Sequence, residues 1–215
     1  MKKIIVVAAL YFTILSPVHT YAIDWTPLQL SLWNPVQLFS EDKSVIGLRL
    51  DLLYGKNKNI YGIDTGIVNT LTGNANGIQV GLVNKADHVK GIQVGLLGES
   101  KSLSGIQLNG FMSKTENLKG ISISYGFPGY SLAGSMDGLQ IGLINRSGTF
   151  EGEGTISFYD STGFQIGGVN ISRNLKGVQI GIVNYCDSMS GVQVGLINYI
   201  HSGPIPFLPI INASF

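Results

Sequence analysis

The side chains of this sequence that could do chemistry are few and scattered. Beyond residue 22 the chain has two histidines, His88 and His201, and one cysteine, Cys186, which lies in a connector between repeats. Asp87 adjoins His88, whereas a metal site needs several His, Cys or carboxylate ligands that converge. A lone cysteine cannot form an internal disulfide. We therefore expect no metal, no cofactor and no disulfide.

The pair His201 and Ser202 is the one that could belong to hydrolytic machinery. Barrel enzymes of the outer membrane that act on lipids combine a serine and a histidine with an acidic or amide partner. Gly203 follows the pair, and no third residue in the sequence is marked as the orienting group. A lipid-modifying barrel enzyme is therefore the least favoured class, and we expect no catalytic residues and no enzymatic activity.

Three charged residues form a further group. Arg49 and Asp51 fall on the same face of an alternating stretch, and a turn at Lys56 and Asn57 would bring Asp64 opposite Arg49. An opposed pair of this kind stabilises neighbouring strands by about 0.2 to 1 kcal/mol. The charges either support the sheet or simply face solvent or a wet lumen.

The elements that must position these residues are repeats. Within the block that starts at Gly77, Ile78 and Val80 fall on one face, while Gln79 and Gly81 fall on the other, which is the period of a strand. Blocks of this form, G-x-Q-x-G-x-x-N with apolar residues at x, recur mostly every 14 or 15 residues, more loosely in some places. They begin at Gly47, Gly62, Gly77, Gly91, Gly105, Gly120, Gly138, Gly163, Gly177 and Gly191.

The connectors between blocks suggest how the strands pair. Ala86 and Asp87 fit a type I turn followed by a left-handed residue at His88. Antiparallel pairing would then set Gln79 opposite Gly95, so that a long side chain fills the space beside a glycine. The equivalent left-handed positions are Ser102, Asn117, Asn174 and Ser188.

This register favours an all-β fold, an antiparallel meander of about 12 short strands closed as a β-barrel. The alternative is a parallel β-solenoid of 14-residue coils, in which glycine would stack on glycine and glutamine on glutamine. Successive connectors look alike, which is more natural in a solenoid, where all of them lie on the same side.

Composition and the N-terminus bound the class of protein. The chain has 215 residues, 29 of them glycine, with 13% charged residues and a formal net charge of +1, which excludes the basic stripe of a nucleic-acid-binding protein. Residues 1–22 have the two lysines, the apolar run and the small residue before the cleavage position that are typical of a secretory signal peptide. We expect an exported protein with a single repeat-built β domain over residues 23–215.

The repeat is interrupted in two places. Residues 28–39, divided by Pro35, predict an irregular first strand or a cap. Residues 127–162 contain glycines, a proline and several aromatic residues, and 149–159 within them predict one divergent strand carrying Glu151 and Glu153. Because repeat proteins place specificity where the repeat breaks, a protein or polysaccharide partner is expected at 127–162.

Two features carry a resemblance. Phe207, Ile211 and Phe215 alternate at the C-terminus and resemble the last strand of outer-membrane β-barrels, although Pro209 and Ala213 depart from that pattern. The tandem blocks resemble those of uncharacterised surface-repeat proteins of Gram-negative bacteria over most of the chain. The resemblance implies export and a surface or outer-membrane location, and it implies no activity or catalytic residue.

Together these observations favour an exported outer-membrane or cell-surface β-barrel with a structural, adhesive or narrow-pore role, in contact with outer-membrane lipid or other envelope components. The apolar band is thin, because three alternate apolar residues per block span only about 13 Å, against about 25 Å for a spanning barrel. The alternative is a soluble, surface-exposed solenoid or closed sheet that serves as an interaction module. In that case the aliphatic residues would form the core and the Gly/Gln face would bind the partner.

Overall fold

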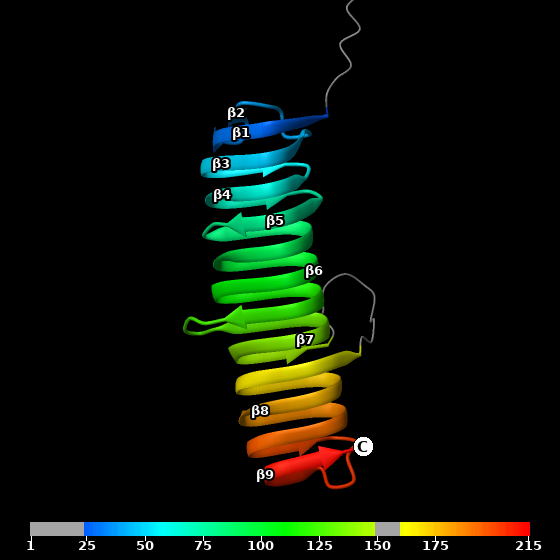
Figure 1. Cartoon of the computed structure of the whole chain (residues 1–215). Coiled ribbons are helices and arrows are strands. Elements are labelled where there is room, and N and C mark those ends of the chain that lie inside the picture. Colours follow the sequence, from blue (N-terminus) through cyan, green and yellow to red (C-terminus); the bar gives the residue numbers. More distant parts are fainter. Residues whose placement is uncertain (1–23, 149–159) are drawn as a thin grey trace, which may run out of the picture.

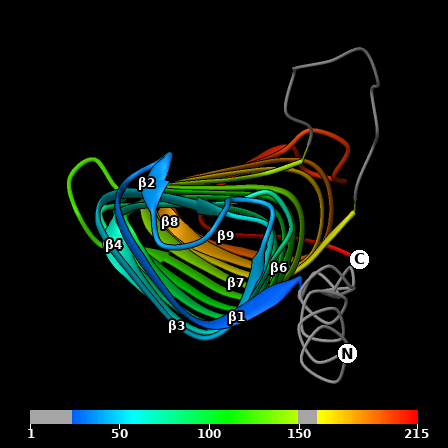
Figure 2. The same cartoon turned by 90° about the horizontal axis from the view of Figure 1, so that it is seen from above.

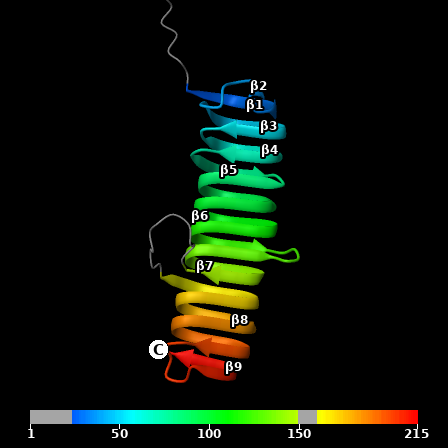
Figure 3. The ribbon, with the colours of Figure 1, turned by 180° about the vertical axis from the view of Figure 1, so that it is seen from behind.

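The computed structural model describes residues 24–148 and 160–215, in which every regular element is a strand. The strands wind into a single stack of coils, a β-solenoid (Figure 1). The coils lie one above another when seen from above (Figure 2), and they form the same continuous stack from behind (Figure 3). The predicted signal peptide and the predicted strand at 149–159 lie outside the described residues.

The sheet follows the chain in sequence order except at its first two strands, where β2 lies outside β1. Two of the strands, β6 and β8, pass through several coils because their ladder hydrogen bonds continue around the bends. The strands are β1 (Trp25–Trp33), β2 (Val36–Gln37), β3 (Ser44–Asn57), β4 (Ile60–Leu71), β5 (Asn74–Val80), β6 (Val83–Ser124), β7 (Tyr130–Ser147), β8 (Ser161–Ile200) and β9 (Phe207–Ser214).

Neighbouring coils run in the same direction, so the predicted antiparallel barrel is wrong and the solenoid alternative is confirmed. Gly77 pairs with Gly91 and Gln79 pairs with Gln93 in parallel register. The same register relates β3 to β4 and β7 to β8. The all-β prediction is confirmed.

The first glycine of each block has a backbone conformation that other residues rarely adopt. The first glycines of the ten blocks have φ values from +124° to +155°, a region that L side chains rarely adopt. A Cβ on Gly177 would lie 1.9 Å from the carbonyl oxygen of Gly163 in the coil below. Among the described non-glycine residues only Ile210 has a positive φ, so the left-handed turns predicted at His88, Ser102, Asn117, Asn174 and Ser188 are wrong.

Amide side chains occupy the interior. The glutamines at the third position of the blocks are buried. Most of them donate from Nε2 to the Oε1 of the glutamine one coil nearer the N-terminus, as Gln93 does to Gln79 at 2.8 Å and Gln179 to Gln165 at 2.8 Å. Gln140 follows a coil with Ser122 at this position and donates instead to the carbonyl oxygens of Ser131 and Arg146. The second hydrogen of the Gln179 amide goes to the carbonyl oxygen of Tyr185 at 3.2 Å. This row is the amide ladder. It satisfies buried polar groups that would otherwise destabilise the fold.

A second interior row holds the asparagines at the eighth position and runs in the opposite sense. Asn170 donates to Asn184 at 2.8 Å, and Asn184 donates to Asn198 at 2.7 Å, one coil nearer the C-terminus. The dipoles of the two rows therefore oppose each other along the stack. The apolar part of the core is a narrow remainder lined by Val45, Ile60, Leu71, Ala75, Ala86, Val89, Leu103, Leu118, Ala133, Met136, Leu175, Cys186, Met189 and Ile200.

Both ends of the stack are capped by a strand that reverses direction. At the first end β2 folds back on β1, and at the last end β9 pairs antiparallel with β8. An exposed parallel edge would be a template for further strand addition, and a reversed strand covers it. The stretch 28–39 is thus a first strand with its return, and the alternating C-terminal residues belong to the closing cap.

Candidate functional site

The most extensive unusual surface is aliphatic and lies on the outside of the stack. We define the outer aliphatic face as the residues at the second, fourth, sixth and seventh positions of the ten blocks. Ile182 is 58% exposed and Leu196 is 69% exposed, and none of the residues in these rows is charged. The aliphatic residues are therefore not the core that the soluble alternative predicted.

The repeat forces this inversion. In a strand, alternate residues point to opposite sides, and the third position of most blocks holds a glutamine whose amide can bond to the same amide in the next coil. Once Gln179 faces inward, its neighbours Val178 and Ile180 must face outward. The Gly/Gln face proposed as a binding surface is consequently buried. The recurrence of glutamine at the third position of the blocks is the sequence feature that indicates this burial.

The area of the outer aliphatic face can be compared with the apolar patches of ordinary soluble proteins. Ten blocks at about 4.8 Å per coil and five residue steps at about 3.3 Å give about 48 Å by about 16 Å, on the order of 800 Å². The largest apolar patch on an ordinary soluble monomer is about 300 to 600 Å². A face of this size marks an interaction surface.

The edges of the face carry an excess of basic side chains. We define the flanking rows as the coil position aligned with Lys85 and the residue immediately before the first glycine of each block; both point outward next to the aliphatic rows. They hold two acidic and seven basic side chains, and some of these pair, as Lys85 does with Glu99 at 3.2 Å. The acidic residues are Glu99 and Asp137, and the basic ones are Lys56, Lys85, Lys90, Lys114, Lys119, Arg146 and Lys176.

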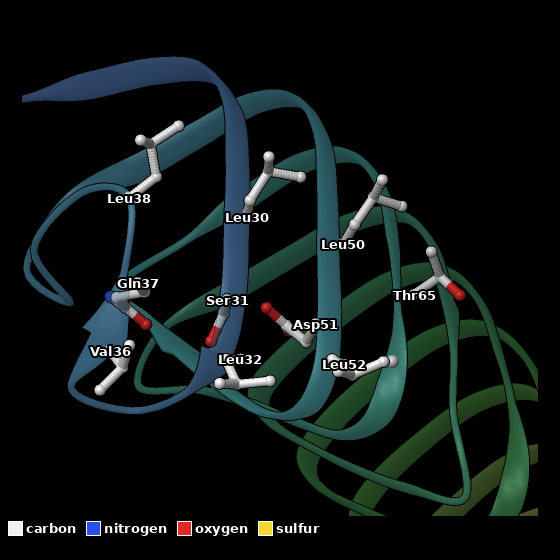
Figure 4. Close-up of a pocket in the computed structure, with 11 residues that line it drawn as sticks. Leu30, Ser31, Leu32, Val36, Gln37, Leu38, Leu50, Asp51, Leu52 and Thr65 are labelled. Carbon is white, nitrogen blue, oxygen red and sulfur yellow. The ribbon is translucent and has the colours of Figure 1, made fainter.

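The face is hollowed at its N-terminal end, where β1 and β2 meet β3. An open groove of about 660 Å³ is lined mainly by leucines from these strands (Figure 4). Leu30 and Leu50 lie on successive strands of one wall, with Thr65 beyond them, and Asp51 points away from the groove mouth toward the interior. The groove continues the outer aliphatic face as far as the cap.

Beneath this groove lies the predicted group of charged residues, now in the interior. Arg49 donates from Nε to Asp64 Oδ1 at 2.6 Å and from Nη2 to Asp64 Oδ2 at 2.7 Å, and both side chains are fully buried. The predicted pairing of Arg49 with Asp64 is confirmed, through a parallel register. The idea that these charges face solvent is wrong.

Asp51 belongs to the same cluster but is poorly satisfied. Its Oδ2 lies 3.1 Å from Arg49 Nε, whose single hydrogen already points at Asp64, and neither oxygen of Asp51 has a hydrogen-bond partner. Burial raises the pKa of Asp51 to about 7; Arg49 opposes the rise and Asp64 adds to it. Asp51 is therefore a nearly buried carboxyl whose pKa lies close to neutrality.

The other residues singled out for chemistry do not converge. His88 is exposed, with Nδ1 2.8 Å from Ser102 Oγ, while Asp87 pairs with Lys101 at 3.0 Å. His201 lies near the ring of Tyr199, with centroids 6.4 Å apart. In residues 24–148 and 160–215 no three His, Cys, Asp or Glu side chains are grouped so that they could hold a metal ion.

Cys186 is a core residue and not the loop residue that its connector suggested. It is fully buried and donates to the carbonyl oxygen of Ser188 at 3.0 Å. Burial raises the pKa of its thiol to about 12, which leaves it without the thiolate that reactive cysteines need.

Comparison with known proteins adds no relative to this description: neither a protein family, nor a curated protein, nor a solved structure matches the chain. Over the part of the chain that the structure describes, no helix has the length and apolar character needed to cross a membrane.

Proposed function

We propose that this chain is an exported β-solenoid interaction module that lies on an anionic lipid surface through its outer aliphatic face. The observation that carries the proposal is the inversion of the blocks, whose glutamines and asparagines lie inside while the aliphatic side chains between them lie outside. Neighbouring rows of Ile, Val and Leu offer a partner apolar contact without hydrogen-bonding groups. A bilayer interface accepts such a surface because it demands no matched polar contacts.

The flanking rows favour lipid over a second copy of the chain. Two copies packed face to face would bring their basic flanking rows together, and like charges across an interface are unfavourable. An anionic lipid surface instead attracts these rows, by about 1 kcal/mol for each Lys or Arg near the headgroups. Charge and apolar area thus support the same partner.

In this arrangement the solenoid lies on the membrane and does not cross it. The side opposite the face is polar, with Asp87, Lys101 and Ser188 among its outward residues, and it would remain in water. Export through residues 1–22 would bring the chain to an envelope membrane. The role we infer is that of a surface module without catalysis.

Vesicle flotation tests the proposal. We expect the chain, prepared without detergent, to float with vesicles made of equal parts phosphatidylglycerol and phosphatidylcholine. With phosphatidylcholine alone flotation should be markedly weaker, and added salt should weaken binding to the anionic vesicles. A chain that stays in the soluble fraction with anionic vesicles, as a monomer or as a dimer, would overturn the proposal.

A matched pair of variants locates the surface. Ile182→Glu with Leu196→Glu places two carboxylates on the outer aliphatic face, whereas Ser188→Glu with Ser202→Glu places the same charge on the polar side of the same two coils. We expect the first variant to lose at least about tenfold in binding to anionic vesicles, because a buried charge costs more than the apolar contact contributes. The second variant should bind nearly as the parent does, and equal losses in both would contradict docking through this face.

A further inference from the structure

One block interrupts the outer aliphatic face with a projecting loop. In a regular block a single residue separates the fifth and seventh positions, as Leu143 separates Gly142 from Ile144. In the coil that begins at Gly120, the chain leaves the ladder after Ser124 and rejoins it at Tyr130, so that five residues occupy this place. We call residues 125–129 the aromatic prong, which is the green loop that projects sideways in Figures 1 and 2.

The base of the prong is held firmly. The backbone nitrogen of Tyr125 donates to the carbonyl oxygen of Asn109 at 3.0 Å, and that of Ile144 donates to the carbonyl oxygen of Gly129 at 2.9 Å. Ser124 Oγ donates to the carbonyl oxygen of Tyr130 at 2.7 Å. These bonds tie both ends of the prong to the coils on either side, so its tip projects from a fixed base.

The tip carries aromatic side chains that pack on little else. Phe127 is 82% exposed and Tyr125 is 66% exposed, and only the C-terminal Phe215 exceeds Phe127 among the exposed large apolar residues described. The prong emerges between the sixth and seventh rows of the outer aliphatic face and projects sideways from the stack (Figure 2). Aromatic side chains in such positions favour the bilayer interface, where the ring is removed from water.

We propose that the aromatic prong is a membrane anchor, in which Phe127 inserts among the acyl chains of an anionic bilayer while the flanking rows contact its headgroups. This inference rests on the proposed lipid docking and deepens it, because it assigns a depth and an orientation to one residue. The prong would fix the solenoid against sliding, since it projects from the regular rows of the face (Figure 1).

Fluorescence of a single tryptophan tests the anchor. Trp25→Phe and Trp33→Phe remove both native tryptophans, and Phe127→Trp then reports from the tip. On anionic vesicles we expect a blue shift of its emission and quenching by lipids brominated in their acyl chains. A control reporter, Ser188→Trp in the same background, lies on the polar side and should show neither change.

The outcomes separate the two proposals. Phe127→Ser should weaken binding to anionic vesicles by about tenfold or more, the loss expected when one aromatic side chain no longer enters the apolar region, with the far-ultraviolet circular dichroism unchanged. If the parent floats with vesicles while Phe127→Trp is not quenched and Phe127→Ser binds equally, the anchor is wrong and the docking stands. If the parent does not float, the docking itself is wrong.

Discussion

The same interior row is built from different chemistry at the two ends of the solenoid. Near the N-terminus its third positions hold Arg49 and Asp64, an ion pair in full burial. Toward the C-terminus they hold glutamines that donate to one another, as Gln193 does to Gln179 at 2.7 Å. The junction is at Gln79, whose Nε2 donates to Asp64 Oδ2 at 2.9 Å.

The difference teaches how an amide ladder begins and ends. Wherever one glutamine follows another in the row, the donor points toward the N-terminus, so a carboxylate at that end accepts the first one. Aligned amides strengthen one another in a low-dielectric interior. At the other end Gln193 Oε1 has no hydrogen-bond partner among the described residues. The glutamines are interchangeable links, whereas the ion pair is a unit whose members depend on each other.

The largest effect is expected from breaking that unit. Arg49→Gln leaves two buried carboxylates without their cation and should lower the free energy of unfolding by about 3 to 5 kcal/mol. Asp64→Gln should act in the same way by leaving Arg49 unpaired. The double variant restores the amide pattern of the later blocks and should be more stable than either single variant. Urea denaturation of the four proteins measures this coupling, and additive losses would show that the charged start is not a unit.

A second prediction sharpens the comparison through pH, because the glutamines of the row do not titrate, whereas Asp51 lies beside Arg49 at the charged end. The pKa of Asp51 in the folded chain is about 7, above the 3.8 of an unperturbed aspartate. The folded state therefore keeps a proton that the unfolded state has released. Asp51 thus stabilises the fold fully below about pH 4, and this contribution is lost as the pH rises toward 7.

Asp51→Asn keeps the shape and removes the titration. The thermal midpoint of the parent should fall relative to that of Asp51→Asn between pH 4 and pH 7, and the difference should be constant above pH 8. Both proteins share every other titratable group, so the difference isolates this carboxyl. Parallel curves for the two proteins would contradict the raised pKa.

The sequence predicts much of this architecture, because alternation identifies the strands and the glycine spacing identifies the repeat. It also places Arg49 opposite Asp64, which holds in either strand direction. The predicted strand direction is wrong, because a glutamine fits beside a glycine as well as it stacks on another glutamine, and only the parallel register of the folded chain decides between them, as for Gln79 and Gln93. The environment of the aliphatic residues depends on the same choice of strand direction. By analogy with ordinary sheets, the sequence assigns these residues either to lipid around a barrel or to a soluble core.

The candidate surface was less predictable than the fold. The projecting tip at Phe127 falls at the start of the irregular region 127–162, where a partner was expected, but nothing in the local sequence fixes how far it extends. The basic flanking rows are recognised only when equivalent residues of successive coils are compared, which lie mostly 14 or 15 residues apart, as Lys176 and Ser190 do. Their charge is diluted in the linear sequence, whose formal net charge is +1.

The smallest effect should come from one link of the amide ladder. Gln179→Leu removes the acceptor of Gln193 and the donor to Gln165 Oε1, and it also leaves the carbonyl of Tyr185 without its side-chain donor. The leucine gains apolar burial, which offsets part of this loss, so we expect a fall in unfolding free energy of about 2 kcal/mol. That is less than the loss of a buried charge partner, because a neutral amide left unpaired costs less than an ion.

Val178→Gln is the matched control, because it introduces an amide at the neighbouring residue, which points outward. An outward amide meets water and should change the free energy of unfolding by no more than about 0.5 kcal/mol. The same variant should weaken vesicle binding, since it places a polar group in the outer aliphatic face. Stability and binding therefore respond to opposite sides of one strand: Gln179→Leu acts on the first, and Val178→Gln acts on the second. A large loss of stability in Val178→Gln would mean that the aliphatic side chains face the interior.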